Sequence, residues 1–363
     1  MDSLPAIRMQ LESLIRRART PGLQYLVVGP ERVEFEYCGG WADLRAGEPL
    51  RVDSTLMAYS MSKTITAAAV LRLSESRGLE LDTPLQEHLE LCPYGAGVTI
   101  RRVLAHTAGI PNPLPLRWVH SPAEHAGFDE PAALAAVLAR HPRLAFTPGT
   151  RYGYSNIGYW LLGALIERVS GRPFTDYVEG EVLGPLGVAA ADLGYWIPTS
   201  PPHARGYLEK YSLTNLLAPL LMERRFLGAY ESRWREIHAH YLDGAAFGGL
   251  VGTARGFGRF LQDQLRPRSV LFGDAVREQS RAQQHALDGT ALPTALGWHI
   301  GTFRGSALDR SGFLYKEGGG AGYHCLMRLY PGCGRGTVLL TNASGFGVHR
   351  LLDRIDPAFL APA

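Results

Sequence analysis

Ser60 and Lys63 have the spacing of a serine nucleophile and its base. They lie at the head of a helical pattern that continues as the apolar run 65–71. Residues three apart lie on one face of a helix, so the hydroxyl and the amine can meet. Burial against the apolar run would lower the pKa of the amine and let it accept the serine proton. The commoner meaning of this spacing is a helix-capping serine followed by a solvated lysine.

The use of lysine in this chain favours a titratable amine at position 63. Among 37 Lys and Arg residues only three are lysines, namely Lys63, Lys210 and Lys316. Arginine serves wherever a fixed positive charge is needed, but it cannot be deprotonated in a protein. Chance alone could also leave three lysines.

Tyr154 and Asn156 form a second candidate stretch, in a loop before the apolar helical run 160–169. A tyrosine can move a proton, and an asparagine can orient an amide or a carbonyl. Both residues are common in loops, so the pair alone is a weak signal. His106 follows a predicted helix that starts at Ile100. It could be a general base, although a histidine at a helix end is more often structural.

A third stretch is glycine-rich and contains Lys316, Glu317, Gly318 and Gly319. A glycine-rich phosphate site needs a following helix to bind the anion. This run instead lies between segments that are typical of strands. The better interpretation is a strand edge that a substrate backbone can approach closely.

Composition indicates an ordinary globular protein. Of the 363 residues, 46% are hydrophobic and 20% are charged. The net charge of +3 is too small and too dispersed to favour nucleic acid. No run approaches the length of a membrane span, and the N-terminus lacks the apolar core of a secretory signal. We therefore expect a cytoplasmic protein without nucleic-acid or membrane partners, unless a signal has been trimmed.

The cysteines and histidines do not predict a metal or cofactor site. The histidines between 120 and 141 lack the compact spacing of metal ligands. No C-x-x-C pair occurs, and we expect reduced, structural thiols. The four cysteines are Cys38, Cys92, Cys325 and Cys333.

The order of the predicted elements indicates an α+β fold. Helix 1–20 precedes strands 23–28 and 33–37, which we expect to form a hairpin at a sheet edge. Strands return late in the chain, at 296–303, 313–316, 323–330 and 337–341, before a last helix at 347–355. Strands at both ends with helices between them predict an antiparallel sheet flanked by helices, plus a mainly helical lobe.

We expect one catalytic domain over 1–363, with its active site between two lobes. The α/β lobe would comprise about 1–58 and 290–363, and the helical lobe about 59–289. Within the helical lobe, 200–246 is aromatic and Arg-rich, with predicted helices at 216–226 and 232–242. This insert could be a lid or the wall of an acyl pocket. A packed structural helix pair is at least as common.

The three stretches in this order, S-x-x-K, Y-x-N and K-x-G, resemble the serine β-lactamase, penicillin-binding protein and esterase superfamily. The Y-x-N form is similar to the class C β-lactamase branch, which includes serine carboxylesterases and D-aminopeptidases. The resemblance covers about residues 20–345. Supporting stretches are His106-Thr107-Ala108-Gly109, Pro148-Gly149-Thr150, Gly248-Gly249-Leu250 and Thr341-Asn342.

The resemblance implies a role for each matching residue. Ser60 would be the acylated nucleophile and Lys63 its base. Tyr154 would share the proton with Lys63 and protonate the leaving group. Asn156 would position Lys63 or the substrate carbonyl.

The late strand would complete the site. Lys316 would lower the pKa of Tyr154, and the backbone N–H groups of Ser60 and Gly319 would form the oxyanion hole. Glu317 departs from the family, which usually has a hydroxyl residue there to hold a substrate carboxylate. If Glu317 faces the cleft, its charge disfavours a carboxylate-bearing substrate. If it turns away, that objection falls.

The expected function is that of a serine hydrolase or acyltransferase acting through an acyl-Ser60 intermediate, chiefly on carboxylic esters. The expected partner is a small-molecule ester or amide substrate. The alternative is a β-lactamase or D-amino-acid peptidase. A second alternative is a penicillin-binding-like sensor without catalysis, against which the retention of all three motifs speaks. The sequence does not indicate the acyl group, the acceptor or the oligomeric state.

Overall fold

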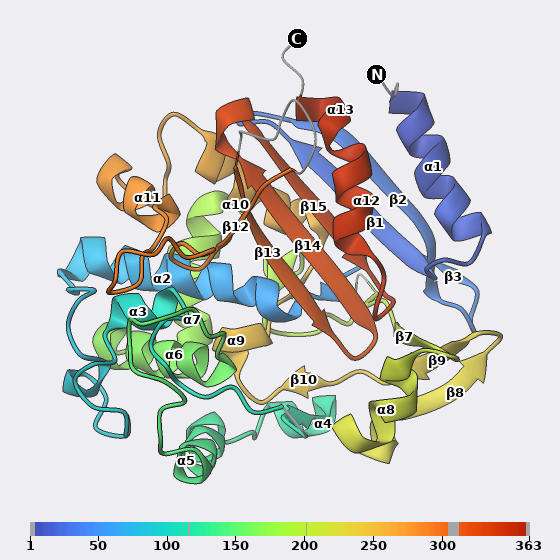
Figure 1. Ribbon diagram of the computed structural model, residues 1–363. Coiled ribbons are helices and arrows are strands. Elements are labelled where there is room, and N and C mark those ends of the chain that lie inside the picture. Colours follow the sequence, from blue (N-terminus) through green and yellow to red (C-terminus); the bar gives the residue numbers. More distant parts are fainter. Residues whose placement is uncertain (1–3, 115–116, 201, 304–311, 361–363) are drawn as a thin grey trace.

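The computed structural model of the protein describes residues 4–114, 117–200, 202–303 and 312–360. Its centre is a seven-stranded antiparallel sheet built from both ends of the chain, in the order β12-β13-β14-β15-β1-β2-β3 (Figure 1). The strands are β1 (Gly22–Val28), β2 (Val33–Asp43), β3 (Glu48–Pro49), β12 (His299–Gly301), β13 (Phe313–Gly320), β14 (Tyr323–Tyr330) and β15 (Arg335–Thr341). The α+β architecture predicted from the sequence is confirmed.

Helices cover both faces of this sheet. Helices α1 (Leu4–Arg16), α12 (Val348–Ile355) and α13 (Pro357–Leu360) lie over one face (Figure 1). The apolar side chains of α1 and α12 pack there against β1, β14 and β15. On the other face, α10 (Ala254–Leu265) packs with the residues of the larger core. Alternate residues of each strand therefore face two different layers.

The middle of the chain is mainly helical and surrounds α2 (Ser62–Arg77). Ten of the first eleven residues of α2 are buried in one run, because neighbouring helices enclose it on all sides. The other helices are α3 (Ile100–Leu104), α4 (Pro122–His125), α5 (Glu130–Arg140), α6 (Asn156–Ser170), α7 (Phe174–Val178), α9 (Ala245–Gly248) and α11 (Asp274–Arg281). Short strands link the layers: β4 (Leu56–Met57), β5 (Val119–His120), β6 (Leu193–Gly194), β10 (Tyr241–Leu242) and β11 (Val251–Gly252).

The insert at 200–246 contains a small sheet that the sequence did not predict. Strands β7 (Gly206–Glu209), β8 (Leu227–Glu231) and β9 (Trp234–Ile237) pair antiparallel, with α8 (Leu213–Leu221) packed on them. The helix predicted at 232–242 is therefore wrong. Ser232 takes a left-handed turn with φ of 55°, which reverses the chain and starts β9 instead.

Three other predicted boundaries also differ. The β1–β2 hairpin lies one strand in from the sheet edge, because the two-residue strand β3 pairs with β2 there. The strand predicted at 296–303 is only His299–Gly301, and the strand predicted to end at 316 continues to Gly320. Over the described ranges, the structure contains no helix long and apolar enough to cross a membrane. All four cysteines are free, as predicted.

The end of β13 lies directly against the turn that carries Ser60. This turn is η1 (Tyr59–Met61), which precedes α2. A Cβ atom added to Gly318 would lie 2.0 Å from the carbonyl oxygen of Ala58. A side chain at position 318 would therefore force the strand and the turn apart.

We expect Gly318→Ala to lower the free energy of unfolding by about 1–3 kcal/mol, the usual range for overpacking. Urea titration measures this change. Gly127→Ala is the matched control, because an added Cβ there meets no atom within 4 Å. A Gly318→Ala protein as stable as the control would show that the close approach of β13 is wrong.

Candidate active site

Ser60 lies on a constrained turn at the N-terminal end of α2. The residue before it, Tyr59, has a φ of 44°, a left-handed conformation that is costly for a tyrosine. The Tyr59 hydroxyl donates to the carbonyl oxygen of Ala321 at 2.8 Å and lies 2.9 Å from His240 Nε2. The backbone N–H of Ala58 donates to Leu250 at 2.9 Å. These contacts hold the turn on both sides of Ser60.

The Lys63 side chain is completely buried, and its Nζ has three oxygen neighbours. Nζ lies 2.8 Å from the amide oxygen of Asn156, 2.7 Å from the carbonyl oxygen of Phe247 and 3.1 Å from Ser60 Oγ. A carbonyl oxygen only accepts hydrogen bonds, so Asn156 and Phe247 each take one N–H. A neutral amine has two N–H groups, and its lone pair is then left for the proton of Ser60.

Tyr154 completes the group around the serine hydroxyl. Its hydroxyl lies 2.6 Å from Ser60 Oγ, and either oxygen can be the donor. The ring lies beneath both amines, with its centroid 4.8 Å from Lys63 Nζ and 5.5 Å from Lys316 Nζ. One amine and one phenol therefore contact the serine hydroxyl, and the second amine lies over the phenol ring.

Tyr154 and Asn156 are placed by the start of α6. Ser155 caps this helix, because its Oγ accepts the N–H of Gly158 at 3.0 Å. The backbone N–H of Asn156 donates to the side-chain oxygen of Asn112 at 3.0 Å. The two residues flank the cap, so the tyrosine and the asparagine both reach the Ser60–Lys63 pair.

Burial sets the protonation states of the three groups. It lowers the pKa of Lys63 well below its ordinary value, and the nearby charge of Lys316 lowers it further. Burial also lowers the pKa of Lys316 to about 7. Burial raises the pKa of Tyr154, against a smaller lowering by its hydrogen bond with Ser60. The pKa of Tyr154 is therefore raised, opposite in direction to the lowering expected from Lys316, because loss of solvation dominates.

His106 supports Tyr154 instead of contacting Ser60. Its Nδ1 accepts the backbone N–H of Ser155 at 3.2 Å, and its ring packs against Tyr154 with centroids 4.4 Å apart. Burial lowers its pKa well below the ordinary value. A neutral, hydrogen-bonded imidazole in this place is structural, so the general-base hypothesis for His106 is not supported.

Glu317 turns away from the Ser60 side of β13. Its carboxylate contacts His324 Nε2 at 2.5 Å and His349 Nε2 at 3.1 Å, and His349 belongs to α12 on the far face of the sheet. Hydrogen bonds from the two histidines lower the pKa of Glu317. Lys316, the preceding residue, faces the opposite layer, as strand alternation requires. The charge of Glu317 therefore does not disfavour a carboxylate-bearing substrate.

A cavity of about 420 Å³ opens beside the serine. Ser60, Asn156 and Gly319 all line it, so the nucleophile and the end of β13 face the same space. Most of the remaining wall is apolar, and the insert at 200–246 contributes part of it. The apolar lining residues are Leu114, Val119, Leu208, Ala218, Met222, Leu242, Phe247 and Ala321.

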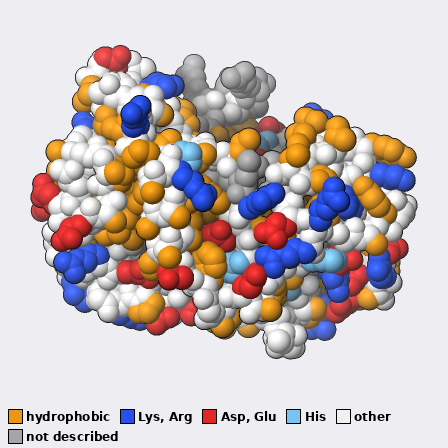
Figure 2. Space-filling model, turned by 90° about the horizontal axis from the view of Figure 1, so that it is seen from below, with side chains coloured by type: hydrophobic (Ala, Val, Ile, Leu, Met, Phe, Trp, Pro, Cys, Tyr) orange, Lys and Arg blue, Asp and Glu red, His pale blue; other side chains and the backbone are white. Residues whose placement is uncertain are grey.

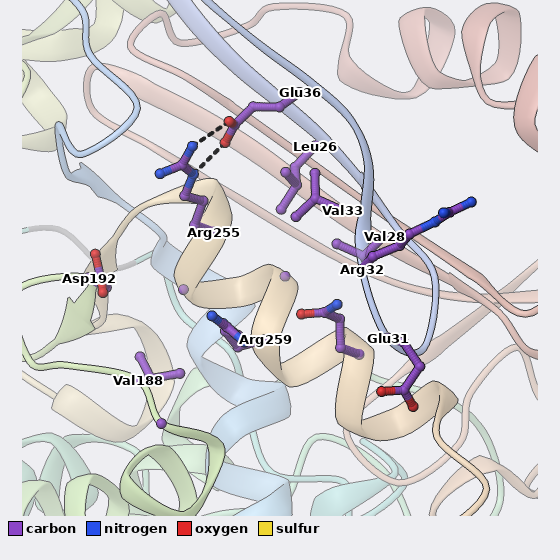
Figure 3. Close-up of a pocket in the computed structure, with 14 residues that line it drawn as sticks. Leu26, Val28, Glu31, Arg32, Val33, Glu36, Val188, Asp192, Arg255 and Arg259 are labelled. Atoms are coloured by element: carbon purple, nitrogen blue, oxygen red, sulfur yellow. Dashed lines mark hydrogen bonds and ion pairs between the residues drawn. The ribbon is translucent and has the colours of Figure 1, made fainter.

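A second cavity, of about 450 Å³, lies between α10 and the β1–β2 hairpin (Figure 3). Its wall mixes charged and apolar side chains, and Arg255 on α10 pairs with Glu36 through two hydrogen bonds of 2.6 and 2.5 Å (Figure 3). It contains none of the residues around Ser60. Within the described part of the chain, no group of three or more His, Cys, Asp or Glu residues is placed to hold a metal ion.

The structure brings together Ser60, Lys63, Tyr154, Asn156 and Lys316, and adds contributors that the sequence did not indicate. The carbonyl oxygen of Phe247 contacts Lys63. Every residue type has a backbone carbonyl, so the sequence could not indicate this contact. The only available signal was the neighbouring Gly248-Gly249-Leu250 stretch. His324 and His349 were missed because the pairing of β14 with β13 and the packing of α12 bring them to Glu317, and residue type alone does not indicate either contact.

Lys316 gives this site a measurable pH dependence of stability. Its Nζ is buried, and among the described residues it has no hydrogen-bond partner. The folded pKa is about 7, whereas an unfolded lysine has a pKa of about 10.4. Between these values the unfolded chain binds more protons, so the Lys316 contribution to stability rises with pH.

We therefore expect Lys316→Met to be more stable than the wild type at pH 7, by more than about 1 kcal/mol. The difference should shrink as the pH rises toward 10. Urea titrations at a series of pH values measure it, with the exposed Lys210→Met as the control. A difference that does not change with pH would contradict the buried, unpaired amine.

Known proteins with similar sequences point to the same superfamily as the three motifs. Residues 9–358 match the Beta-lactamase family. The chain is 24% identical over 314 residues to penicillin-binding protein 4* of Bacillus subtilis, covering 85% of this chain and 65% of that protein. It is 32% identical over 191 residues to esterase EstB of Burkholderia gladioli, covering 49% of this chain and 48% of the esterase. The chain spans less than two thirds of the length of either relative.

The fold has close structural neighbours. The D-amino acid amidase from Ochrobactrum anthropi SV3, solved with D-phenylalanine, superposes with a TM-score of 0.80. It is 21% identical, and the superposition covers 98% of this chain and 99% of the amidase. The resemblance expected from the three motifs is thus confirmed over nearly the whole chain, and the protein belongs to the β-lactamase family.

Proposed function

We propose that the protein is a serine hydrolase that cleaves carboxylic esters with an apolar chain through an acyl-Ser60 intermediate. The observation that carries this proposal is the set of contacts around Ser60 Oγ, which lies 3.1 Å from Lys63 Nζ and 2.6 Å from the Tyr154 hydroxyl. A nucleophile with a neutral amine and a phenol at these distances can lose its proton as it attacks.

In acylation, Ser60 Oγ attacks the ester carbonyl carbon while its proton moves to Lys63 Nζ. The two carbonyl oxygens on Lys63 then stabilise the ammonium that forms. As the tetrahedral intermediate collapses, the bond to the leaving alcohol breaks and Tyr154 gives its proton to the alkoxide oxygen. Lys63 returns its proton to Tyr154, so the alcohol leaves neutral and Ser60 stays acylated.

The oxyanion would be held by the backbone N–H groups of Ser60 and Gly319. Both residues line the cavity, and Gly318 lets β13 lie against the nucleophile turn. One such donor typically contributes about 3 kcal/mol to the stability of the transition state. Deacylation repeats these steps with water as the nucleophile, and another alcohol in its place would give acyl transfer.

The lining of the cavity supports an apolar substrate. Apolar side chains from both lobes and from the insert form most of the wall, and pockets of this size bury most of the surface of a small ligand. Ala218 and Met222, on and just after α8, contribute to it. These contacts support the role of a pocket wall for the insert.

Amide or β-lactam cleavage is the second candidate. The orientation of Glu317 favours it, since no carboxylate at that position repels a charged substrate. The same Ser60 chemistry would serve. Nitrocefin turnover faster than that of short esters would decide for this candidate.

Short p-nitrophenyl esters should give a burst of p-nitrophenolate and add one acyl group to the intact protein, measured by mass spectrometry. Ser60→Ala should abolish the added mass and lower turnover at least about 10³-fold. Ser76→Ala, exposed on the same helix, should keep both. Turnover that survives in Ser60→Ala would refute the mechanism. Failure of folded protein to react with a fluorophosphonate would favour the non-catalytic sensor.

Tyr154→Phe should lower kcat/KM about 10²–10⁴-fold, because the leaving group loses its acid. Neutral Lys63 is the active form, so kcat/KM falls as the pH drops through the pKa of this amine. That acid limb should stay near its wild-type position in the variant. Tyr152→Phe, whose hydroxyl contacts His299 instead of Ser60, is the control. If the fall of kcat/KM at low pH disappears in Tyr154→Phe, the base would be the phenol of Tyr154 and not the amine of Lys63.

A further inference from the structure

Helix α8 presents an apolar face to solvent. Leu213, Leu216 and Leu220 follow the i, i+3, i+7 spacing of one helix face and are 69%, 74% and 69% exposed. Leu217, beside them, is 38% exposed, and Tyr211, just before the helix, is 86% exposed. An amphipathic helix in a soluble domain usually turns such a face inward, so this arrangement requires an explanation.

The exposed leucines have no space beneath the helix. The inner side of α8 is already packed, with Ala218 and Met222 buried against Leu208, Phe226 and Ile237. The outer leucines would have to displace this cluster to become buried. The fold therefore keeps them at the surface.

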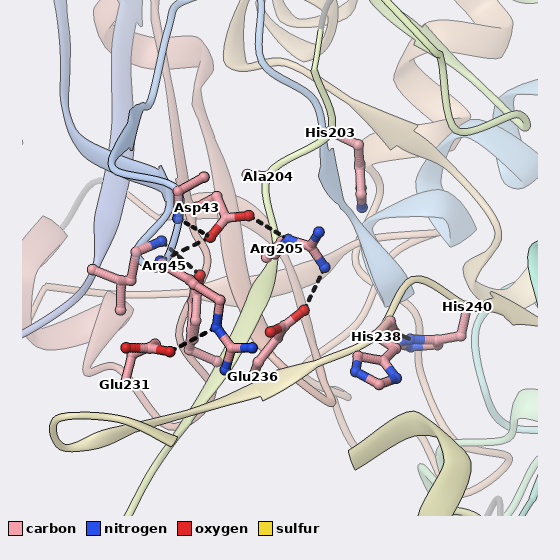
Figure 4. Close-up of polar contacts among 12 residues, drawn as sticks. Asp43, Arg45, His203, Ala204, Arg205, Glu231, Glu236, His238 and His240 are labelled. Atoms are coloured by element: carbon pink, nitrogen blue, oxygen red, sulfur yellow. Dashed lines mark hydrogen bonds and ion pairs between the residues drawn. The ribbon is translucent and has the colours of Figure 1, made fainter. Parts of the chain in front are cut away.

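The small sheet under α8 is attached firmly to the rest of the protein. Arg205 donates to Asp43, at the end of β2, at 2.6 Å, and also contacts Glu236 on β9 (Figure 4). The side chain of Asn342 donates to the carbonyl oxygen of Arg205 at 3.0 Å. Because of these contacts, α8 has a fixed position on the molecule.

Cations flank the apolar face at both ends. Lys210 precedes Tyr211, and Arg224 and Arg225 follow the helix. Arg225 pairs with Glu124 and Glu223. Within the described ranges, Lys210 and Arg224 have no carboxylate at ion-pair distance. Figure 2 shows apolar side chains among Lys and Arg on the right of the face seen from below, the side where Figure 1 places α8.

We propose that this face of α8 docks on a lipid surface with anionic headgroups. A leucine face with an aromatic neighbour and flanking cations has the chemistry of helices that lie in a membrane interface. The patch is too small for a stable dimer, because standard protein interfaces use about 20–30 residues a side. The sequence-based expectation of no membrane partner rested on the lack of a spanning segment. A helix that docks on the lipid surface does not have to span the membrane.

Docking would place the cavity next to the lipid. Thr214 and Ala218 of α8 line the space that contains Ser60, so one helix contacts both. This consequence rests on the proposed function: an apolar ester could pass from the lipid phase to Ser60 with little exposure to water. The docking itself does not require catalysis.

The test is flotation with vesicles of phosphatidylcholine and phosphatidylglycerol in equal parts. We expect the wild type and Ser60→Ala to float, and Leu216→Ser/Leu220→Ser to bind at least about tenfold more weakly. High salt or pure phosphatidylcholine should weaken wild-type binding. The matched control is Leu91→Ser/Leu287→Ser, which removes two leucines that are exposed elsewhere (46% and 67%) and should float like the wild type.

Two outcomes would overturn the proposal. One is a wild type that does not float, or an α8 variant that floats equally well. The other is a wild type that sediments as a dimer and an α8 variant that is monomeric, which would make a second copy of the chain the occupant. Hydrolysis of a soluble short ester should be equal in the α8 variant and the wild type. Failure of vesicle binding thus remains separate from failure of the proposed chemistry.

Discussion

The candidate site depends on one interaction, the burial of the Lys63 amine between two carbonyl oxygens. Within the described ranges no carboxylate lies at ion-pair distance of Nζ, so no negative charge opposes the loss of its proton on burial. An ordinary salt bridge would keep this amine charged and useless as a base. Two acceptors without charge instead fix its N–H groups and leave the lone pair for Ser60.

Several elements of the fold serve this arrangement. Helix α2 supplies burial along its whole first half, α9 supplies the carbonyl oxygen of Phe247, and the start of α6 supplies Asn156. Lys316, from the distant end of the chain, adds a like charge that lowers the pKa of Lys63 further. The sheet from both chain ends and the helical middle thus have to come together before the serine can react.

Much of this could be predicted from the sequence, because side-chain chemistry and local spacing carry it. The S-x-x-K, Y-x-N and K-x-G stretches marked the groups that meet around Ser60, and the strands at both ends indicated the architecture. Other features depend on tertiary packing. The Phe247 contact uses a backbone atom, and Glu317 turns toward histidines that β14 and α12 bring beside it. Burial raises the pKa of Tyr154, against the expected lowering. The strands of the insert depend on a left-handed turn at Ser232, which a serine at this position does not predict.

The chain has only three lysines, so the protonation of Lys63 can be observed directly. The measurement is an NMR pH titration of protein labelled with ¹³C at lysine Cε, assigned with Lys316→Met and Lys210→Arg variants. The Lys63 signal should titrate well below the ordinary lysine pKa. A Lys63 signal that titrates near the ordinary value of about 10.4 would contradict the account.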